Sequence, residues 1–213
     1  MYPSPTHIGL LMAGGKGTRM GTATEKPLME LAGKMMIEHV LDRLIGVRGL
    51  KGLICVTSTN TPKTTSFLRQ VGYDVLVAAG LGYYEDLKAA LEKLGPGLYV
   101  TFSADVPFLV PQVIDGLLVR HSAGDLADRN YVVVVVSEHL AKSVGVPLRS
   151  VTRFSHEGKH YFPTGIRMIR YGAVPVGEVL SDPFFVTVEE PRLAINVNTL
   201  EDLRVAELVA RSL

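Results

Sequence analysis

The chain has 213 residues, of which 47% are hydrophobic, and it carries 22 Lys and Arg against 21 Asp and Glu. We expect a single domain over residues 1–213, because this length supports one sizeable core. A formal net charge of +1 argues against a nucleic acid partner, which needs a strong positive field. The longest apolar run, residues 131–136, is too short to span a bilayer as a helix, and the first residues lack the basic segment of a signal peptide. We therefore expect no membrane span and a cytoplasmic protein.

Short apolar runs alternate with segments of helical period, which indicates a doubly wound α/β fold with a mostly parallel sheet and helices on both faces. The expected strands are residues 8–12, 52–57, 74–77, 98–103, 131–137, 165–170, 184–188 and 193–197. The expected helices are residues 36–45, 62–71, 83–94, 111–122 and 200–212. Several strands are apolar throughout, so we expect a sheet that is buried on both faces.

Residues 142–188 interrupt this alternation because they are rich in Gly, Pro and aromatic residues. We expect an acceptor-side lobe or lid at about 142–188, inserted before the last strand, with a hairpin over 153–162. A plain extension of the sheet is the alternative interpretation.

A glycine-rich segment follows the first expected strand. Residues 13–21 read A-G-G-K-G-T-R-M-G, and residues 25–28 read E-K-P-L. Ligands of open α/β sheets bind at the carboxyl ends of the strands. There, glycines let backbone N–H groups approach phosphate oxygens, and Lys16, Arg19 and Lys26 add positive charge. The segment predicts a phosphate site, although its spacing fits neither the P-loop nor the dinucleotide fingerprint.

These two segments resemble the signature of nucleotidyltransferases with a GT-A-like fold, the group that includes molybdenum-cofactor guanylyltransferases. The resemblance implies that the loop wraps the triphosphate of a nucleotide. Lys16, Arg19 and Lys26 would be catalytic cations that neutralise the departing pyrophosphate. The implied nucleotide contacts within the loop are Ala13, Gly14, Gly15, Gly17 and Thr18.

A single carboxylate, Asp105, follows the expected strand 98–103. Without the loop, such a carboxylate is more often a turn or capping residue. The resemblance implies that Asp105 is catalytic and binds Mg²⁺. It also implies a second metal ligand in the segment N-x-N-T, where Asn198 is the candidate and Asn196 the reserve, although an amide oxygen binds Mg²⁺ less strongly than a carboxylate.

One branch, the archaeal-type adenosylcobinamide-phosphate guanylyltransferases, resembles the chain along most of its length, residues 123–159 excepted. The shared pieces lie at residues 13–28, 57–64, 80–87, 103–105, 163–166 and 196–203. The branch transfers GMP from GTP to adenosylcobinamide phosphate in cobalamin biosynthesis and releases pyrophosphate.

In this branch, the turn with Thr57, Ser58 and Asn60 would lie near the base and ribose. A plain helix-capping turn is an equal alternative for that segment. Gly82, Tyr83 and Gly165 would lie on the acceptor side, and a β-bulge is the rival interpretation of Gly165.

Two other functions stay open at this point. A molybdenum-cofactor guanylyltransferase would share the loop, Asp105 and the N-x-N-T segment, and would differ in its acceptor. A non-catalytic GTP-binding module would share the loop and transfer nothing. The implied partners are GTP and a phosphate-bearing small molecule, the implied cofactor is Mg²⁺, and the sequence leaves open whether the chain forms a homodimer.

Overall fold

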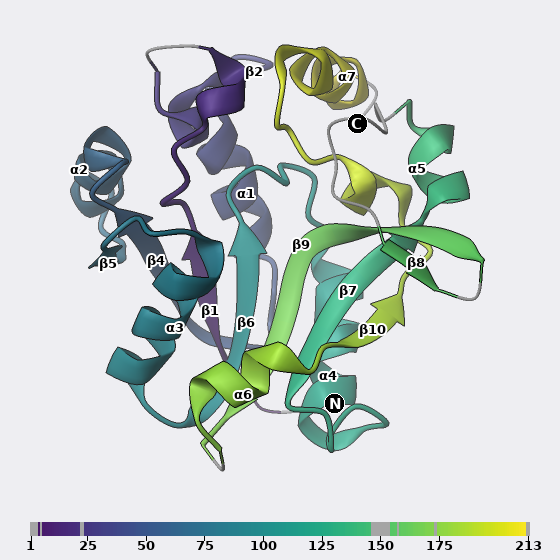
Figure 1. Cartoon of the computed structure of the whole chain (residues 1–213). Helices are drawn as coiled ribbons and strands as arrows, with labels where there is room; N and C mark the ends of the chain where they lie inside the picture. The colour runs from purple at the N-terminus through teal and green to yellow at the C-terminus, as the bar shows by residue number, and fades with distance from the viewer. Residues whose placement is uncertain are drawn as a thin grey trace.

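A mixed β-sheet with helices on both faces forms the centre of the molecule (Figure 1). The computed structural model describes residues 4, 6–21, 24–145, 154–156, 158–172 and 174–211. In these residues, eight strands form the sheet in the order β10-β7-β9-β6-β1-β4-β5, with β8 paired to β9. Their bounds are β1 (His7–Met12), β4 (Leu50–Ser58), β5 (Asp74–Ala78), β6 (Gly97–Ser103), β7 (Tyr131–Ser137), β8 (Phe154–His156), β9 (Lys159–Tyr171) and β10 (Phe184–Thr187).

All pairings along this order are parallel except those of β9, which runs antiparallel between β6 and β7. A separate two-stranded ribbon joins β2 (Glu30–Leu31) and β3 (Lys34–Met35). The helices are α1 (Met36–Leu44), α2 (Pro62–Gln70), α3 (Tyr83–Leu94), α4 (Pro111–Ala123), α5 (Glu138–Ser143), α6 (Val176–Ser181) and α7 (Leu200–Ala210). The expected α/β architecture is confirmed.

The sheet has an apolar core on each face because its central strands are apolar on both sides. On one face, α1 and α4 bury side chains such as Leu41 and Leu117. On the other face, α3 and α6 bury side chains such as Leu87 and Val179. The two cores fix the carboxyl ends of β1, β4 and β6 at one edge, where the site lies.

The prediction of a strand at residues 193–197 is wrong. Residues Pro191–Ala194 form the short helix η3, whose start is capped by the Glu190 carboxylate that accepts a hydrogen bond from the Arg192 N–H at 3.1 Å. Pro191 fits the first position of such a helix, since it has no N–H to donate. The apolar run around Leu193 is therefore buried as a helical turn, and residues 195–198 lead from it into α7.

Part of the segment assigned to an acceptor-side lobe lies inside the sheet. Residues 159–171 form β9, between β6 and β7, so for these residues the alternative interpretation, an extension of the sheet, fits the structure. The expected hairpin is present as the antiparallel pair of β8 and β9. Residues 146–153, which belong to the same expectation, lie outside the described residues.

The described helices are too short or too polar to cross a lipid bilayer.

A buried histidine pair lies near the start of β1, far from the carboxyl edge of the sheet. His7 Nε2 and His121 Nδ1 are 2.8 Å apart, and both side chains are fully buried. Burial lowers the pKa of His7 to about 3 and that of His121 to about 4, and the charge of Arg170 acts in the same direction on both. The pair is therefore neutral in the folded protein at pH 5, whereas in the unfolded chain each histidine gains a proton near its ordinary pKa of about 6.5.

We expect the free energy of unfolding to fall as the pH is lowered from about 7 to about 5. Protonation then favours the unfolded chain by about 2 kcal/mol for each of the two histidines. Urea unfolding across this range measures the loss, with the exposed His139→Gln variant as a control that keeps the same slope. A stability that is constant over this range would contradict the low pKa values.

Candidate active site

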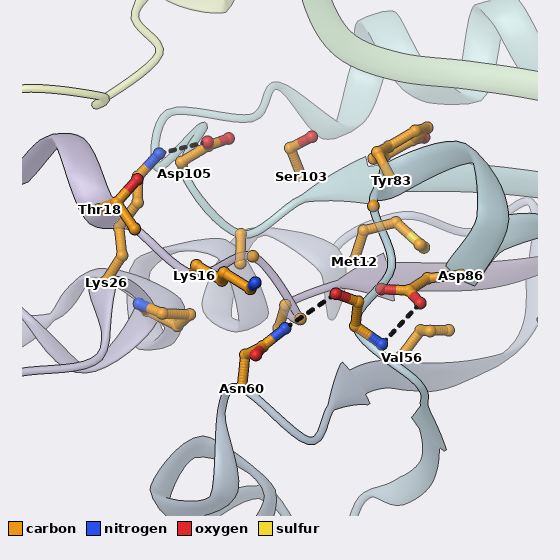
Figure 2. Close-up of a pocket in the computed structure, with 18 of the residues that line it drawn as sticks. Met12, Lys16, Thr18, Lys26, Val56, Asn60, Tyr83, Asp86, Ser103 and Asp105 are labelled. Carbon is orange, nitrogen blue, oxygen red and sulfur yellow. Dashed lines mark hydrogen bonds and ion pairs between the residues drawn. The ribbon is translucent and has the colours of Figure 1, made fainter.

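A pocket of about 510 Å³ opens at the carboxyl ends of β1, β4 and β6 (Figure 2). Twelve predicted site residues line it: Ala13, Gly14, Gly15, Lys16, Gly17, Thr18, Lys26, Asn60, Gly82, Tyr83, Asp105 and Asn198. They come from separate segments of the chain. The fold therefore brings together most of the residues that the sequence singled out.

The glycine-rich loop after β1 forms one wall of the pocket. Within the described part of the chain, no hydrogen bond uses the backbone N–H groups of Gly15, Lys16 or Gly17. Gly17 has a φ of 61°, and a Cβ there would lie 2.9 Å from Lys26 Cβ, so glycine lets the loop close onto the E-K-P-L segment. Free N–H groups together with the exposed Lys16 make this wall an anion-binding surface.

The residue after this loop, Arg19, lies in the short helix η1 (Thr18–Met20). Its side chain is not among those that the structure describes, so its predicted role stays a prediction.

Glu25 fixes the far end of the loop to α2. Its carboxylate accepts hydrogen bonds from the N–H groups of Lys63 and Thr64 at 2.8 and 2.7 Å, and from the Thr64 hydroxyl at 2.6 Å. These are N–H groups of the first turn of α2, which a carboxylate stabilises. Glu25 thereby positions its neighbour Lys26 in η2 (Lys26–Leu28).

Lys26, Asp105 and Asn198 meet at one end of the pocket. The Lys26 ammonium donates to Asp105 Oδ2 at 2.5 Å and to Asn198 Oδ1 at 3.0 Å. The side chains of Lys26 and Asp105 are 13% and 23% exposed, so water screens this pair less than it screens a surface pair. A cation thus lies between the two oxygens that the sequence proposed as metal ligands.

The other oxygen of Asp105, Oδ1, is buried and has no hydrogen-bond partner among the described residues. An unsatisfied carboxylate oxygen beside an amide oxygen suits a hard divalent cation such as Mg²⁺, which usually takes one or two protein ligands and completes its shell with phosphate oxygens and water. In the described residues, no cluster of three or more His, Cys, Asp or Glu could hold a metal ion by itself. The residues therefore fit a metal that binds together with a nucleotide.

Asn196 and Asp202 position Asn198. Asn198 Nδ2 donates to Asn196 Oδ1 at 2.9 Å, which turns Asn198 Oδ1 toward Lys26. Asp202 Oδ2 accepts from the N–H groups of Asn198 and Thr199 at 2.9 and 2.8 Å, in a capping box at the start of α7. Asn196 is not part of the pocket wall, so the geometry favours Asn198 over the reserve.

The opposite end of the pocket is formed by Asn60, Gly80 and Asp86 (Figure 2). Asn60 Nδ2 donates to Gly80 O at 3.1 Å, and Asp86 Oδ1 accepts from the N–H groups of Gly80 and Leu81 at 2.9 and 3.3 Å. Gly80 has a φ of 77°, and any Cβ there would collide with the Asn60 amide. This network holds polar side chains at a fixed place on the wall.

Thr57 and Ser58, two predicted nucleotide contacts, lie behind this wall. Thr57 is fully buried and its hydroxyl accepts from Thr65 Oγ1 at 2.8 Å. Ser58 Oγ donates to Gly14 O at 2.6 Å. For these two residues the structure fits the alternative interpretation, a structural turn that supports the loop.

On the acceptor side, Gly82 and Tyr83 line the pocket, whereas Gly165 does not. Gly165 is buried on β9 with a φ of 76°, at a point where the register between β7 and β9 shifts. A Cβ at this position would lie 3.0 Å from Ser103 Cβ. The geometry of Gly165 is therefore that of the rival interpretation, a β-bulge glycine.

The sequence did not single out Glu25, Asp86 or Ser103 for the site. The capping role of Glu25 and the contacts of Asp86 join segments that only folding brings together. Ser103, which lines the pocket, ends β6 two residues before Asp105. A signal existed for Ser103, because it shares a strand end with a proposed metal ligand, and Glu25 and Asp86 lie in the shared segments 13–28 and 80–87.

A glycine-rich loop with free N–H groups and an Asp–Asn oxygen pair at the carboxyl edge of an α/β sheet are features expected of a nucleotide-binding enzyme site. Solved structures share the fold: CMP:2-keto-3-deoxy-manno-octonic acid synthetase complexed with CTP aligns with a TM-score of 0.66 at 17% identity, over 97% of this chain and 99% of that one. A hypothetical transferase from Thermus thermophilus aligns with a TM-score of 0.63 at 17% identity, over 93% and 99%.

Residues 9–168 match the MobA-like NTP transferase domain, so the chain belongs to this family and is a nucleotidyltransferase. Members of the family generally use a divalent metal ion. The chain is 29% identical to the adenosylcobinamide-phosphate guanylyltransferase of Methanocaldococcus jannaschii, over 95% of this chain and 96% of that protein. It is 36% identical to the "Probable molybdenum cofactor guanylyltransferase" of Pyrococcus horikoshii, over 52% of this chain and 54% of that protein.

Proposed function

We propose that this chain transfers GMP from GTP to the phosphate of adenosylcobinamide phosphate and releases pyrophosphate. The observation that carries the proposal is the convergence of the glycine-rich loop and the Asp105–Asn198 oxygen pair on one pocket. The match to the Methanocaldococcus jannaschii relative over nearly the full length of both chains supports this acceptor. The match to the Pyrococcus horikoshii protein covers only about half of each chain.

The reaction needs little help from a general base. A phosphate monoester has a second pKa near 6 and is largely dianionic at neutral pH. One of its oxygens attacks the α-phosphorus of GTP and forms a new P–O bond. The bond from the α-phosphorus to the bridging oxygen breaks, and its electron pair leaves with pyrophosphate. Catalysis then rests on positioning and on stabilisation of charge.

The pocket residues divide these tasks. In our proposal, the loop N–H groups, Lys16 and Arg19 hold the β- and γ-phosphates. Asp105 and Asn198 would hold Mg²⁺, which supplies positive charge beside the α-phosphate. Lys26, whose ammonium lies beside Asp105, would neutralise charge on the α-phosphate.

We place the nucleobase at the end of the pocket formed by Asn60 and Asp86. Guanine has N–H donors on its Watson–Crick edge, and the Asp86 carboxylate and the Asn60 amide oxygen are acceptors for such donors. Adenine offers an acceptor nitrogen in place of the ring N–H. The buried Asp86 is held by two backbone N–H groups, which supports a fixed reading geometry.

The rim of the pocket suits a bulky apolar acceptor. Leu81 lines the pocket and is 77% exposed, and Tyr84, which packs edge-on against Tyr83, is 54% exposed. Large apolar side chains that stay exposed next to a pocket are typical of binding surfaces. A corrinoid is a large and mostly apolar disc on a tether that ends in phosphate, so only the tether needs to enter.

We expect GTP to bind more tightly than ATP, CTP or UTP, because the base end offers acceptors for the donors of guanine. Loss of a matched hydrogen bond in a buried site costs about 1–3 kcal/mol, so the preference over ATP should be about tenfold or more. Calorimetric titration of the four nucleotides with Mg²⁺ measures it. Equal or tighter binding of ATP or CTP would contradict the guanylyl assignment.

A further inference from the structure

Arg167 is a half-buried arginine on β9 that has no anionic partner among the described residues. It pairs with Thr101 of β6 and Val133 of β7, in the middle of the sheet. Its Nε and Nη1 atoms are buried and have no hydrogen-bond partner in the described residues. Burial acts on its charge most strongly, followed by the hydroxyls of three tyrosines, Tyr83, Tyr131 and Tyr84, of which Tyr83 also contributes a hydrogen-bond interaction. No described carboxylate forms an ion pair with it.

An unpaired guanidinium in such a place is costly for the free protein. Burial of a charge without an opposite charge is among the most destabilising arrangements in a protein. The guanidinium carbon lies 4.3 Å from the centre of the Tyr83 ring, and this stack offsets only part of the cost. A charge kept without a partner therefore indicates an anion that arrives from outside.

A second unsatisfied donor lies on the same face of the sheet. The Tyr131 hydroxyl is buried and forms no hydrogen bond of good geometry among the described residues, and Arg167 and Tyr84 both lie close enough to act on it. N–H and O–H groups without acceptors are complementary to an oxyanion, because each phosphate oxygen accepts hydrogen bonds. Arg167 and Tyr131 together form a ready set of donors.

Tyr83 connects this set to the pocket. Its ring stacks on Arg167, its hydroxyl lies 2.9 Å from Thr101 Oγ1, and it lines the pocket. In the view of Figure 2, Asp105, Ser103 and Tyr83 follow one another along one side of the pocket. Ser103 is two residues from Thr101 on β6, and the side chains of both point to the face that carries Arg167. Because Arg167 pairs with Thr101, it lies two residues further from the carboxyl edge of the sheet than Ser103 does.

We propose that Arg167, with the Tyr131 hydroxyl, binds the phosphate monoester of the acceptor beside Ser103 and Tyr83. The inference rests on the proposed function and names the acceptor-phosphate site for it. Tyr83 covers Arg167 in the absence of acceptor, so entry of the phosphate requires the Tyr83 side chain to rotate and give up its contact with Thr101. The phosphate then lies between the donor set and the α-phosphate of the nucleotide.

Arg167→Met tests this assignment, because methionine is apolar and of similar length. We expect the KM for adenosylcobinamide phosphate to rise about 30-fold or more, while the Kd for GTP changes less than about twofold. We also expect the melting temperature to stay constant or rise, since an unpaired buried charge is removed. Arg167→Lys keeps the charge and should give an intermediate KM.

Arg129→Met is the matched control. Arg129 also stacks on an aromatic ring, 4.2 Å from the centre of Phe184, but Phe184, unlike Tyr83, does not line the pocket. Both the KM and the kcat of this variant should equal those of the wild type. An unchanged acceptor KM in Arg167→Met would overturn the assignment. If the melting temperature also fell, the arginine would be purely structural.

Binding of phenyl phosphate separates this inference from the proposed function. Phosphorus NMR would follow the titration of this monoester into wild type and Arg167→Met, each saturated with GTP without Mg²⁺. Binding by the wild type alone supports the site even if adenosylcobinamide phosphate proves not to be the acceptor. Equal binding by both proteins would overturn the site even if guanylyl transfer takes place.

Discussion

Asp105→Asn should reduce guanylyl transfer by about 100-fold or more while the chain keeps its fold. The substitution retains the shape of the side chain but replaces a charged oxygen pair with a neutral amide. Asp105 Oδ1 is the buried oxygen without a partner among the described residues, and Oδ2 holds Lys26. In our proposal, both the binding of Mg²⁺ and the placement of Lys26 depend on this charge. The initial rate of pyrophosphate release at saturating GTP measures the effect.

Asp42→Asn is the matched control for this variant. Asp42 forms an ion pair with Lys34 at 2.8 Å, in which both side chains are more than half exposed. Such a surface pair contributes little, so the control should have the rate of the wild type. A near-normal rate for Asp105→Asn at saturating Mg²⁺ would place the metal elsewhere.

Lys26→Met should lower the rate by about 100-fold or more, through loss of positive charge at the α-phosphate. It should also lower the free energy of unfolding by about 1–3 kcal/mol, because Asp105 and Asn198 both lose a mostly buried hydrogen-bond donor. Rates at saturating GTP and urea unfolding measure the two effects.

Lys34→Met breaks the exposed ion pair with Asp42 and is the control for both measurements. It should change stability by less than about 1 kcal/mol and leave the rate unaltered. A Lys26→Met enzyme with a wild-type rate would show that Lys26 only balances the charge of Asp105 and takes no part in transfer.

Local sequence patterns predicted most of the fold. Runs such as residues 131–137 are apolar throughout, and burial on both faces gave them the expected strand conformation. The place of the glycine-rich loop on the pocket wall was predicted equally well, because it directly follows a strand, and its phosphate-binding role stays a prediction. Thr199 and Asp202 form a capping box at the start of α7, which lies within the expected helix 200–212.

Features that depend on contacts between distant segments could not be predicted. The position of β9 between β6 and β7 depends on strand pairing, and local periodicity does not predict which strands pair. The apolar run at 193–197 was interpreted as a strand because a buried helical turn has the same composition. Glu25 caps a helix that starts 37 positions later in the chain, at Pro62, and only the folded structure brings the two together.

Four expectations stay predictions: the cytoplasmic location, the single domain, the role of Arg19 and the acceptor-side lobe over residues 146–153. Whether the chain forms a homodimer stays open.

Transfer of GMP to a defined acceptor tests the central claim most directly. Purified protein would be incubated with GTP and Mg²⁺, and with either adenosylcobinamide phosphate or molybdopterin, while pyrophosphate release and the guanylylated product are measured. We predict pyrophosphate and guanylylated cobinamide with the first acceptor and no product with the second. Product with molybdopterin alone would contradict the account in favour of a molybdenum-cofactor guanylyltransferase. GTP binding without product from either acceptor would contradict it in favour of a non-catalytic GTP-binding module.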